Sequence, residues 1–116
     1  MNAELASLMR RIKRFARERD WEQFHTPKNL AMAMSVEAAE VVEIFQWLTE
    51  AESRALPKNK VNDLGDELAD TYIYLLKLAD HFGIDLNQVA TAKIRKNAQK
   101  YPVSKARGSA KKYDEF

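Results

Sequence analysis

The chain has 116 residues, with 19 Lys and Arg, 17 Asp and Glu, and no cysteine. This length suits one domain, and the lack of cysteine excludes a disulfide framework and any Cys-based zinc site. So short a chain buries only part of its surface, so we expect it to oligomerise. No apolar run reaches the ~20 residues of a membrane span, and no signal-peptide stretch begins the chain. A cytoplasmic protein without a membrane partner is therefore expected.

Helix-forming signals dominate the first half of the chain. Apolar residues recur at helical spacing and predict a first helix over about 3–19: Leu5, Leu8, Ile12 and Phe15. Thr26 is a good N-cap and Pro27 suits the first helical position. These two residues predict the start of a second helix, which extends to about residue 48.

Two further helices are predicted in the second half. A loop over 49–59 separates the second helix from a third, which spans about 60–82 and ends before Gly83. Asp85 can cap a fourth helix over about 86–101. We find no alternating strand pattern and no internal repeat, so four helices with short loops predict an all-α protein, a four-helix bundle completed by oligomerisation.

The last residues differ in composition from the rest. Pro102 stops the fourth helix, and residues 103–116 are polar and basic. We expect a single domain over 1–102, followed by a C-terminal tail that stays mobile until a ligand orders it.

Four carboxylates form two pairs with the spacing of one helical turn, Glu37 with Glu40 and Glu67 with Asp70. Residues three apart share a helix face, so the two pairs converge if the second and third helices pack antiparallel. No Lys or Arg occurs over 29–53 or 61–76, where apolar residues surround the acids. Buried carboxylates need a positive partner, and here a cation from outside the chain is the simplest one.

Oxygen donors without a neighbouring His or Cys suit Mg²⁺ better than zinc, with Mn²⁺ also possible. Mg²⁺ commonly binds substrate phosphates, so the pattern predicts phosphoryl chemistry with water as the acceptor. Spacing does not identify the general base, since Glu37, Glu40 and Glu67 are all eligible. A di-iron bundle needs a Glu-x-x-His pair on each of two helices. This chain has only one such spacing, Glu22 with His25, and it lies before the second predicted helix, so a di-iron site is not expected.

Aromatic residues form a second group of candidates. Trp21 and His25 precede the second helix, Trp47 follows Glu40 by seven residues, and Tyr74 lies one turn after Asp70. Aromatic faces beside a phosphate-binding cation could stack a nucleobase, although core packing is the alternative for such residues.

A third group lies near the end of the fourth predicted helix. Helical spacing gathers its polar members into one stripe, which Tyr101 follows: Lys93, Lys96, Asn97 and Lys100. Such a stripe can hold a polyphosphate, and it can equally be a solvated helix face.

With these residues identified, the chain resembles the MazG-like nucleotide pyrophosphohydrolases of the all-α NTP pyrophosphatase superfamily. The pattern E-x-x-E…E-x-x-D matches at the four acids, and further segments resemble the dCTP pyrophosphatase branch: Arg19-Asp20-Trp21-Glu22-Gln23-Phe24-His25, Phe45-Gln46-Trp47 and Lys100-Tyr101-Pro102-Val103. The resemblance covers nearly the whole chain. It departs at Ile12, where animal members of the branch carry a base-contacting histidine, so strict cytosine selectivity is not implied.

The resemblance implies Mg²⁺-dependent hydrolysis of a nucleoside triphosphate, dCTP or a modified dCTP, to the monophosphate and pyrophosphate. It implies that the four acids bind the metal, that His25, Trp47 and Tyr74 line the nucleotide pocket, and that the lysine stripe approaches the phosphates. It also implies a homodimer or homotetramer whose sites include residues from a neighbouring subunit. Such an enzyme would remove unwanted nucleotides from the pool.

The sequence leaves two alternative functions open. One is a related enzyme that acts on dUTP or on many dNTPs. The other is a non-enzymatic helical module that binds nucleic acid through the basic segments at both ends of the chain. The acidic centre disfavours this second alternative, because its carboxylates would repel phosphates in the absence of a cation, and no stable nucleic-acid complex is expected.

Overall fold

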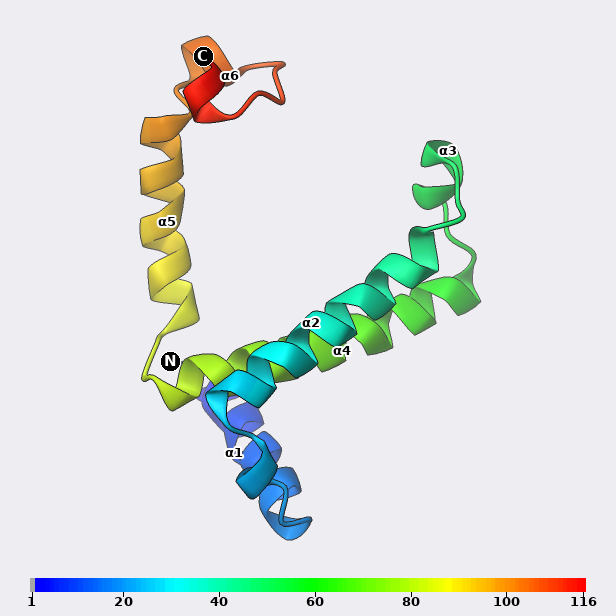
Figure 1. Ribbon diagram of the computed structural model, residues 1–116, viewed down its shortest axis with the longest axis vertical. Coiled ribbons are helices and arrows are strands. Elements are labelled where there is room, and N and C mark those ends of the chain that lie inside the picture. The colour runs from blue at the N-terminus through cyan, green and yellow to red at the C-terminus, as the bar shows by residue number, and fades with distance from the viewer. Residues whose placement is uncertain (1) are drawn as a thin grey trace. The chain divides into compact units, whose positions relative to one another are not determined.

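A computed structural model describes residues 2–116, and it divides the chain into two compact units, Met1–Gly83 and Ile84–Phe116. Each unit is considered by itself. Over the described residues the secondary structure is helical and contains no strand (Figure 1). The predicted all-α fold is therefore confirmed. No helix among residues 2–116 is long and apolar enough to cross a membrane.

The first unit begins with helix α1 (Ala3–Glu18). The Asn2 side chain caps it by accepting a hydrogen bond of 2.7 Å from the backbone N–H of Leu5. The helix ends at Glu18 with Arg19 as C-cap, and Asp20 follows in the left-handed region with φ of 54°. This reversal leads into a short 3₁₀ helix, η1 (Glu22–Phe24), which carries the chain to the next long helix.

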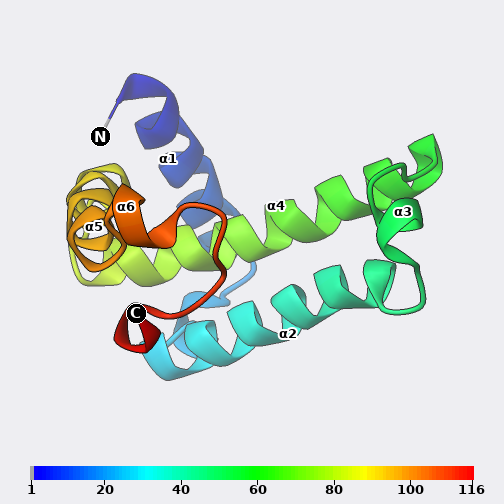
Figure 2. The same cartoon turned by 90° about the horizontal axis from the view of Figure 1, so that it is seen from above.

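Helix α2 (Pro27–Phe45) starts as the sequence predicts, with Thr26 as N-cap and Pro27 in the first turn. It runs antiparallel to helix α4 (Lys58–His81), and the two lie side by side in both views (Figures 1 and 2). Gly83 follows α4 with φ of 65°, a conformation that favours glycine. The second predicted helix was expected to reach residue 48, but it ends at Phe45.

A short helix, α3 (Glu50–Ser53), interrupts the loop expected over 49–59. Thr49 and Glu52 form a capping box: the Thr49 hydroxyl accepts from the Glu52 N–H, and the Glu52 carboxylate accepts from the Thr49 N–H. Neighbouring residues along the chain therefore account for this one-turn helix, which lies between the end of α2 and the start of α4.

The first unit has a small apolar core where α1 crosses α4. Its most buried residues come from all three long helices: Met9, Ile12 and Ala16 from α1, Leu30 from α2, and Leu76 and Ala79 from α4. On the outside of α4, four apolar side chains remain at least one-third exposed: Val61, Leu68, Tyr72 and Leu75. Their spacing places them on one face of the helix. Other residues of the first unit leave this apolar stripe on α4 partly exposed.

The second unit contains helix α5 (Leu86–Lys100), a short helix α6 (Val103–Ala106) and a 3₁₀ helix, η2 (Tyr113–Glu115). Asp85 caps α5 by accepting from the Gln88 N–H at 3.1 Å. The tail over 103–116, expected to be mobile, returns to the end of α5 through contacts of Tyr101 with Tyr113 and Phe116, whose ring centroids lie 6.2 and 5.9 Å away.

Candidate metal centre and nucleotide pocket

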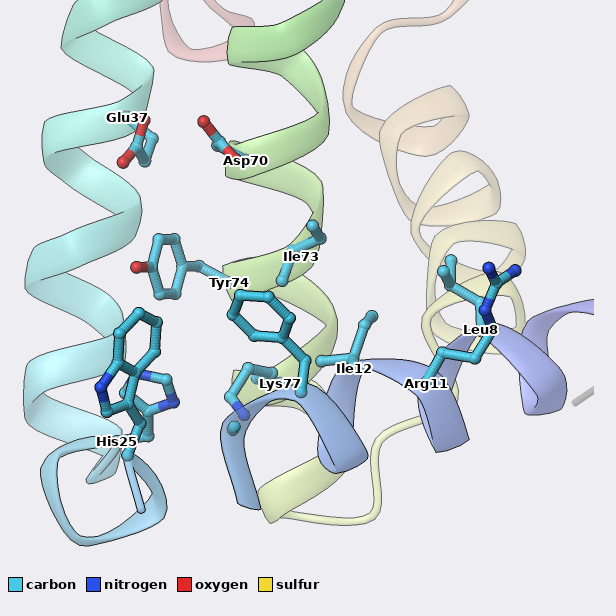
Figure 3. Close-up of a pocket in the computed structure, with 12 residues that line it drawn as sticks. Leu8, Arg11, Ile12, His25, Glu37, Asp70, Ile73, Tyr74 and Lys77 are labelled. Atoms are coloured by element: carbon cyan, nitrogen blue, oxygen red, sulfur yellow. The ribbon is translucent and has the colours of Figure 1, made fainter. Parts of the chain in front are cut away.

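The antiparallel pairing of α2 with α4 brings predicted acids together. One carboxylate oxygen from each of Glu37, Glu67 and Asp70 lies within 4.8 Å of the others. Figure 3 shows Glu37 on α2 opposite Asp70 on α4. The helices place them there because Glu67 and Asp70 share one face of α4, and that face packs against the face of α2 that carries Glu37. These three residues are called the carboxylate group below.

Glu40, the fourth predicted acid, lies at the edge of this group. Its contact with Glu67 is the largest cause of the raised pKa of Glu67. Glu40 and Glu67 also line a second, more open pocket of about 330 Å³ with Glu43, Asp63 and Asp66. The four acids singled out from the sequence therefore lie together, since Glu40, Glu67 and Asp70 each affect the pKa of Glu37.

Two atoms of the carboxylate group are buried without a partner. Within residues 2–116, no hydrogen-bond donor meets Oε2 of Glu37 or Oε2 of Glu67. Burial, followed by contact with Glu40, raises the pKa of Glu37. Contact with Glu40 is the largest cause that raises the pKa of Glu67 to about 7, followed by burial and by repulsion from Glu40 and Glu37. The chain thus holds negative charges together without supplying the positive charge that would stabilise them.

These residues fit a divalent cation. All the ligand atoms offered are carboxylate oxygens, with no His or Cys in the group, which is the donor set of hard cations. The orphaned oxygens of Glu37 and Glu67 are unsatisfied acceptors of the kind that a cation would satisfy. A cation would also lower the raised pKa values of both acids, because opposite charge favours the ionised form.

A pocket of about 580 Å³ opens beside the carboxylate group, with Glu37 and Asp70 at one end. Aromatic rings from three segments line it in an edge-to-face series. Ring centroids lie 5.7 Å apart for Phe15 and Trp21, 6.3 Å for Trp21 and His25, and 6.1 Å for His25 and Tyr74. Such a wall offers flat apolar surfaces next to a phosphate-binding centre.

The turn before α2 positions His25 in this pocket. The Asn29 side chain donates a hydrogen bond of 2.9 Å to the Phe24 carbonyl, and the Gln23 side chain donates to Asp20, so the turn is fixed on both sides of the ring. Burial is the main cause that lowers the pKa of His25, and the nearby Lys77 ammonium lowers it further. Its Nδ1 is buried and finds no partner among residues 2–116. The ring therefore carries a buried, unsatisfied polar atom beside the pocket.

Several residues predicted to bind nucleotide are not among those that line this pocket. Trp47 follows the end of α2 and is 87% exposed. The remaining candidates are exposed residues of the second unit: Lys93, Lys96, Asn97, Lys100 and Tyr101. Of the predicted nucleotide-binding residues, the pocket brings together Trp21, His25 and Tyr74 with two of the acids.

The pocket also contains residues that sequence reasoning did not select. Ile12 and Arg11 come from α1, and Ile73 and Lys77 come from α4. A signal for Lys77 was present in the sequence, because it follows Asp70 by seven residues and Tyr74 by three, which is the spacing of one helix face. No comparable local pattern marks the residues of α1, which reach the pocket only through the packing of α1 on α4.

Comparisons with known proteins agree with this site. A model of the MazG-like family matches residues 32–116, which include all four acids. dCTP pyrophosphatase 1 of Mus musculus is 43% identical over 114 residues, covering 97% of this chain and 67% of that protein. The Homo sapiens protein of the same name is 40% identical over 115 residues, with the same coverage.

A crystal structure of a pyrophosphatase from Archaeoglobus fulgidus has the same fold, with a TM-score of 0.81 and 36% identity. The match covers 88% of this chain and 95% of that one. The family model spans most of the chain, and the identity to two curated relatives is 40% or more. The chain therefore belongs to the MazG-like family.

Proposed function

We propose that this chain is a nucleoside triphosphate pyrophosphohydrolase that converts dCTP, or a modified dCTP, to the monophosphate and pyrophosphate with Mg²⁺. The observation that carries the proposal is the carboxylate group with its two orphaned oxygens, placed at the end of an aromatic pocket. The names of the related proteins, dCTP pyrophosphatase 1, support the choice of substrate.

The carboxylate group would hold the cation through Glu37, Glu67 and Asp70, with Glu40 beside them. A divalent cation bound there neutralises phosphate charge and activates water. The α2–α4 pair fixes these acids on two rigid helices, so little reorganisation is needed when a triphosphate arrives. The site therefore suits attack at a phosphorus atom placed next to the acids.

The aromatic wall would hold the nucleobase. Tyr74 lies between the acids and His25 in Figure 3, so a nucleotide with its phosphates at the acids would direct its base towards His25 and Trp21. Stacking on aromatic rings stabilises bound bases by about 1–3 kcal/mol each. Burial is the main cause that raises the pKa of Tyr74, and repulsion from Glu37 and Asp70 raises it further. The phenol of Tyr74 therefore stays protonated beside the substrate.

The remaining candidates would complete the site from further segments. We propose that Trp47 contacts the nucleotide and that the lysine stripe, ending at Lys100, approaches the phosphates. Lys100 and Trp47 are both exposed, so each is free to contact a ligand or a neighbouring subunit.

We further propose that the protein is a homodimer or homotetramer. The apolar stripe on α4 leaves Leu68 50% and Tyr72 45% exposed. Gly65 lies in the same stripe, and a Cβ added to it would meet nothing within 4 Å in its own subunit. A glycine inside a helix costs about 1 kcal/mol relative to alanine. Close approach of a second copy would account for both the glycine and the exposed stripe.

A panel of triphosphates tests the proposed activity. The protein would be incubated with dCTP, 5-methyl-dCTP, dUTP, dTTP, dATP and dGTP, with Mg²⁺ or with EDTA, and the products separated by chromatography. We expect Mg²⁺-dependent formation of monophosphate, fastest with the cytosine nucleotides. Turnover of dUTP alone would assign a different substrate, and no turnover of any triphosphate would refute the proposal.

A further inference from the structure

Lys77 lies at the end of the pocket away from the acids. Asp70, Tyr74 and Lys77 follow one another along a single face of α4, and Figure 3 shows them in this order. A rise of ~1.5 Å per residue puts Lys77 about 10 Å along the helix from Asp70. This separation is comparable to the length of a nucleoside. A nucleotide whose phosphates lie at the acids would therefore bring its base near Lys77.

The Lys77 side chain is half-buried and lines the pocket next to His25. Burial is the main cause that lowers the pKa of Lys77, and repulsion from Lys13 lowers it further. The charges of Glu22 and Asp80 act in the opposite direction and raise this pKa. An ammonium group in such surroundings lacks part of its hydration, so a hydrogen-bond acceptor delivered by a ligand gains more there than at the surface.

Among residues 2–116, no acid pairs with this ammonium directly. Asp80 forms its ion pair with Lys13, at 3.1 Å, rather than with Lys77. Within residues 2–116, Lys77 takes part in no ion pair and in no side-chain hydrogen bond. Next to it, Nδ1 of His25 is also buried without a partner. Two polar groups thus lie unsatisfied at the end of the pocket away from the acids.

We propose that Lys77 is a specificity-determining residue, whose ammonium donates a hydrogen bond to an acceptor atom on the edge of the bound nucleobase. The carbonyl oxygen and the unprotonated ring nitrogen of cytosine are acceptors of this kind. The inference rests on the proposed function, since it needs a nucleotide in the pocket. It assigns recognition of the base to a side chain of α4 that lies outside the carboxylate group.

Binding of non-hydrolysable ligands tests this role. The probes are α,β-imido-dCTP and the matching α,β-imido triphosphate of abasic deoxyribose, titrated calorimetrically in the presence of Mg²⁺. The variants are Lys77→Met, which keeps the length of the side chain, and Lys77→Gln as a polar second substitution. Lys13→Met is the matched control, because Lys13 also lies next to Asp80 but does not line this pocket.

We expect both Lys77 variants to bind the dCTP analogue roughly tenfold more weakly than the wild type, as for loss of one charge-assisted hydrogen bond. Binding of the abasic ligand should be unchanged, and Lys13→Met should bind both ligands as the wild type does. Equal weakening of both ligands would show that Lys77 acts on the phosphates or on the fold, and would overturn the inference. Unchanged binding of the dCTP analogue would also overturn it.

The wild type separates this inference from the proposed function. If the wild-type protein bound neither ligand, the proposed function itself would fail, and the inference with it. If the wild type bound the dCTP analogue more tightly than the abasic ligand and the Lys77 variants did so equally well, only the role of Lys77 would be refuted.

Discussion

His25 and Tyr74 meet edge to face, with ring centroids 6.1 Å apart and planes at 82°. They are far apart in sequence: His25 lies in the turn before α2, and Tyr74 lies in the middle of α4. Tyr74 also stands one turn from Asp70, so this contact joins the aromatic wall to the carboxylate group. This contact supports the proposed placement of the nucleotide, with its phosphates at the acids and its base at the aromatic rings.

The proposed metal centre predicts that Glu37→Gln nearly abolishes turnover. The substitution removes one charged ligand but keeps the shape of the side chain, so we expect kcat to fall at least about a hundredfold, since a metal supplies several kcal/mol to the transition state. The rate of pyrophosphate release from saturating dCTP measures kcat for each variant. Glu18→Gln, at the exposed end of α1, is the control and should keep wild-type activity. Equal activity of the two variants would argue against the site.

The raised pKa of Glu67 predicts how stability depends on pH without metal. Its pKa moves from an ordinary value of 4.5 to about 7 in the folded protein. Between these two values the folded state binds more protons than the unfolded state, so the free energy of unfolding falls as pH rises. In EDTA, the melting temperature should therefore decrease from pH 5 to pH 8.

Mg²⁺ should reverse this trend, because it binds the ionised carboxylates of the folded protein. The increase in melting temperature on adding Mg²⁺ should be larger at pH 8 than at pH 5. Glu67→Gln should flatten the profile in EDTA and reduce the effect of Mg²⁺. A profile in EDTA that rises through this range, in the wild type, would contradict the assignment of Glu67.

The aromatic wall predicts a role for the ring of Tyr74 rather than its hydroxyl group. Tyr74→Leu removes the stacking surface and should raise KM for dCTP about tenfold, as expected for loss of one base contact. Tyr74→Phe keeps the ring and should stay within about twofold of the wild type. Steady-state kinetics on both variants distinguish the two parts of the side chain, and a large effect of Tyr74→Phe would assign the contact to the hydroxyl.

The apolar stripe on α4 predicts that charge there weakens the association of subunits. Leu68→Lys replaces a half-exposed leucine that would be buried between copies. Burial of such a side chain contributes about 1.5–3 kcal/mol, so the dissociation constant of the oligomer should rise at least about tenfold. Analytical ultracentrifugation measures it. Val103→Lys, an exposed valine of the second unit, is the control, and an unchanged oligomer with Leu68→Lys would place the interface elsewhere.

Local signals account for most of the helix boundaries. Thr26 with Pro27, Asp85, and Gly83 mark positions where capping and backbone conformation depend on neighbours along the chain. The capping box of Thr49 and Glu52 is equally local, so α3 could also have been found from the sequence. Helix spacing likewise predicts which acids share a face.

Spacing fails where the helix does not continue. Trp47 follows Glu40 by seven residues, which predicts a shared face, but α2 ends at Phe45 and Trp47 leaves the helical register. The contact of His25 with Tyr74 and the arrival of Ile12 in the pocket depend on tertiary packing of three helices. Local periodicity carries no information about such contacts.

The position at which dCTP is cleaved is the most direct test of the proposed pyrophosphohydrolase activity. The purified protein would be incubated with dCTP and Mg²⁺, and the products followed by ³¹P nuclear magnetic resonance. We expect dCMP and pyrophosphate in equal amounts, no dCDP, and no reaction in EDTA. Release of inorganic phosphate with dCDP, or pyrophosphate formation that continues unchanged in EDTA, would contradict it.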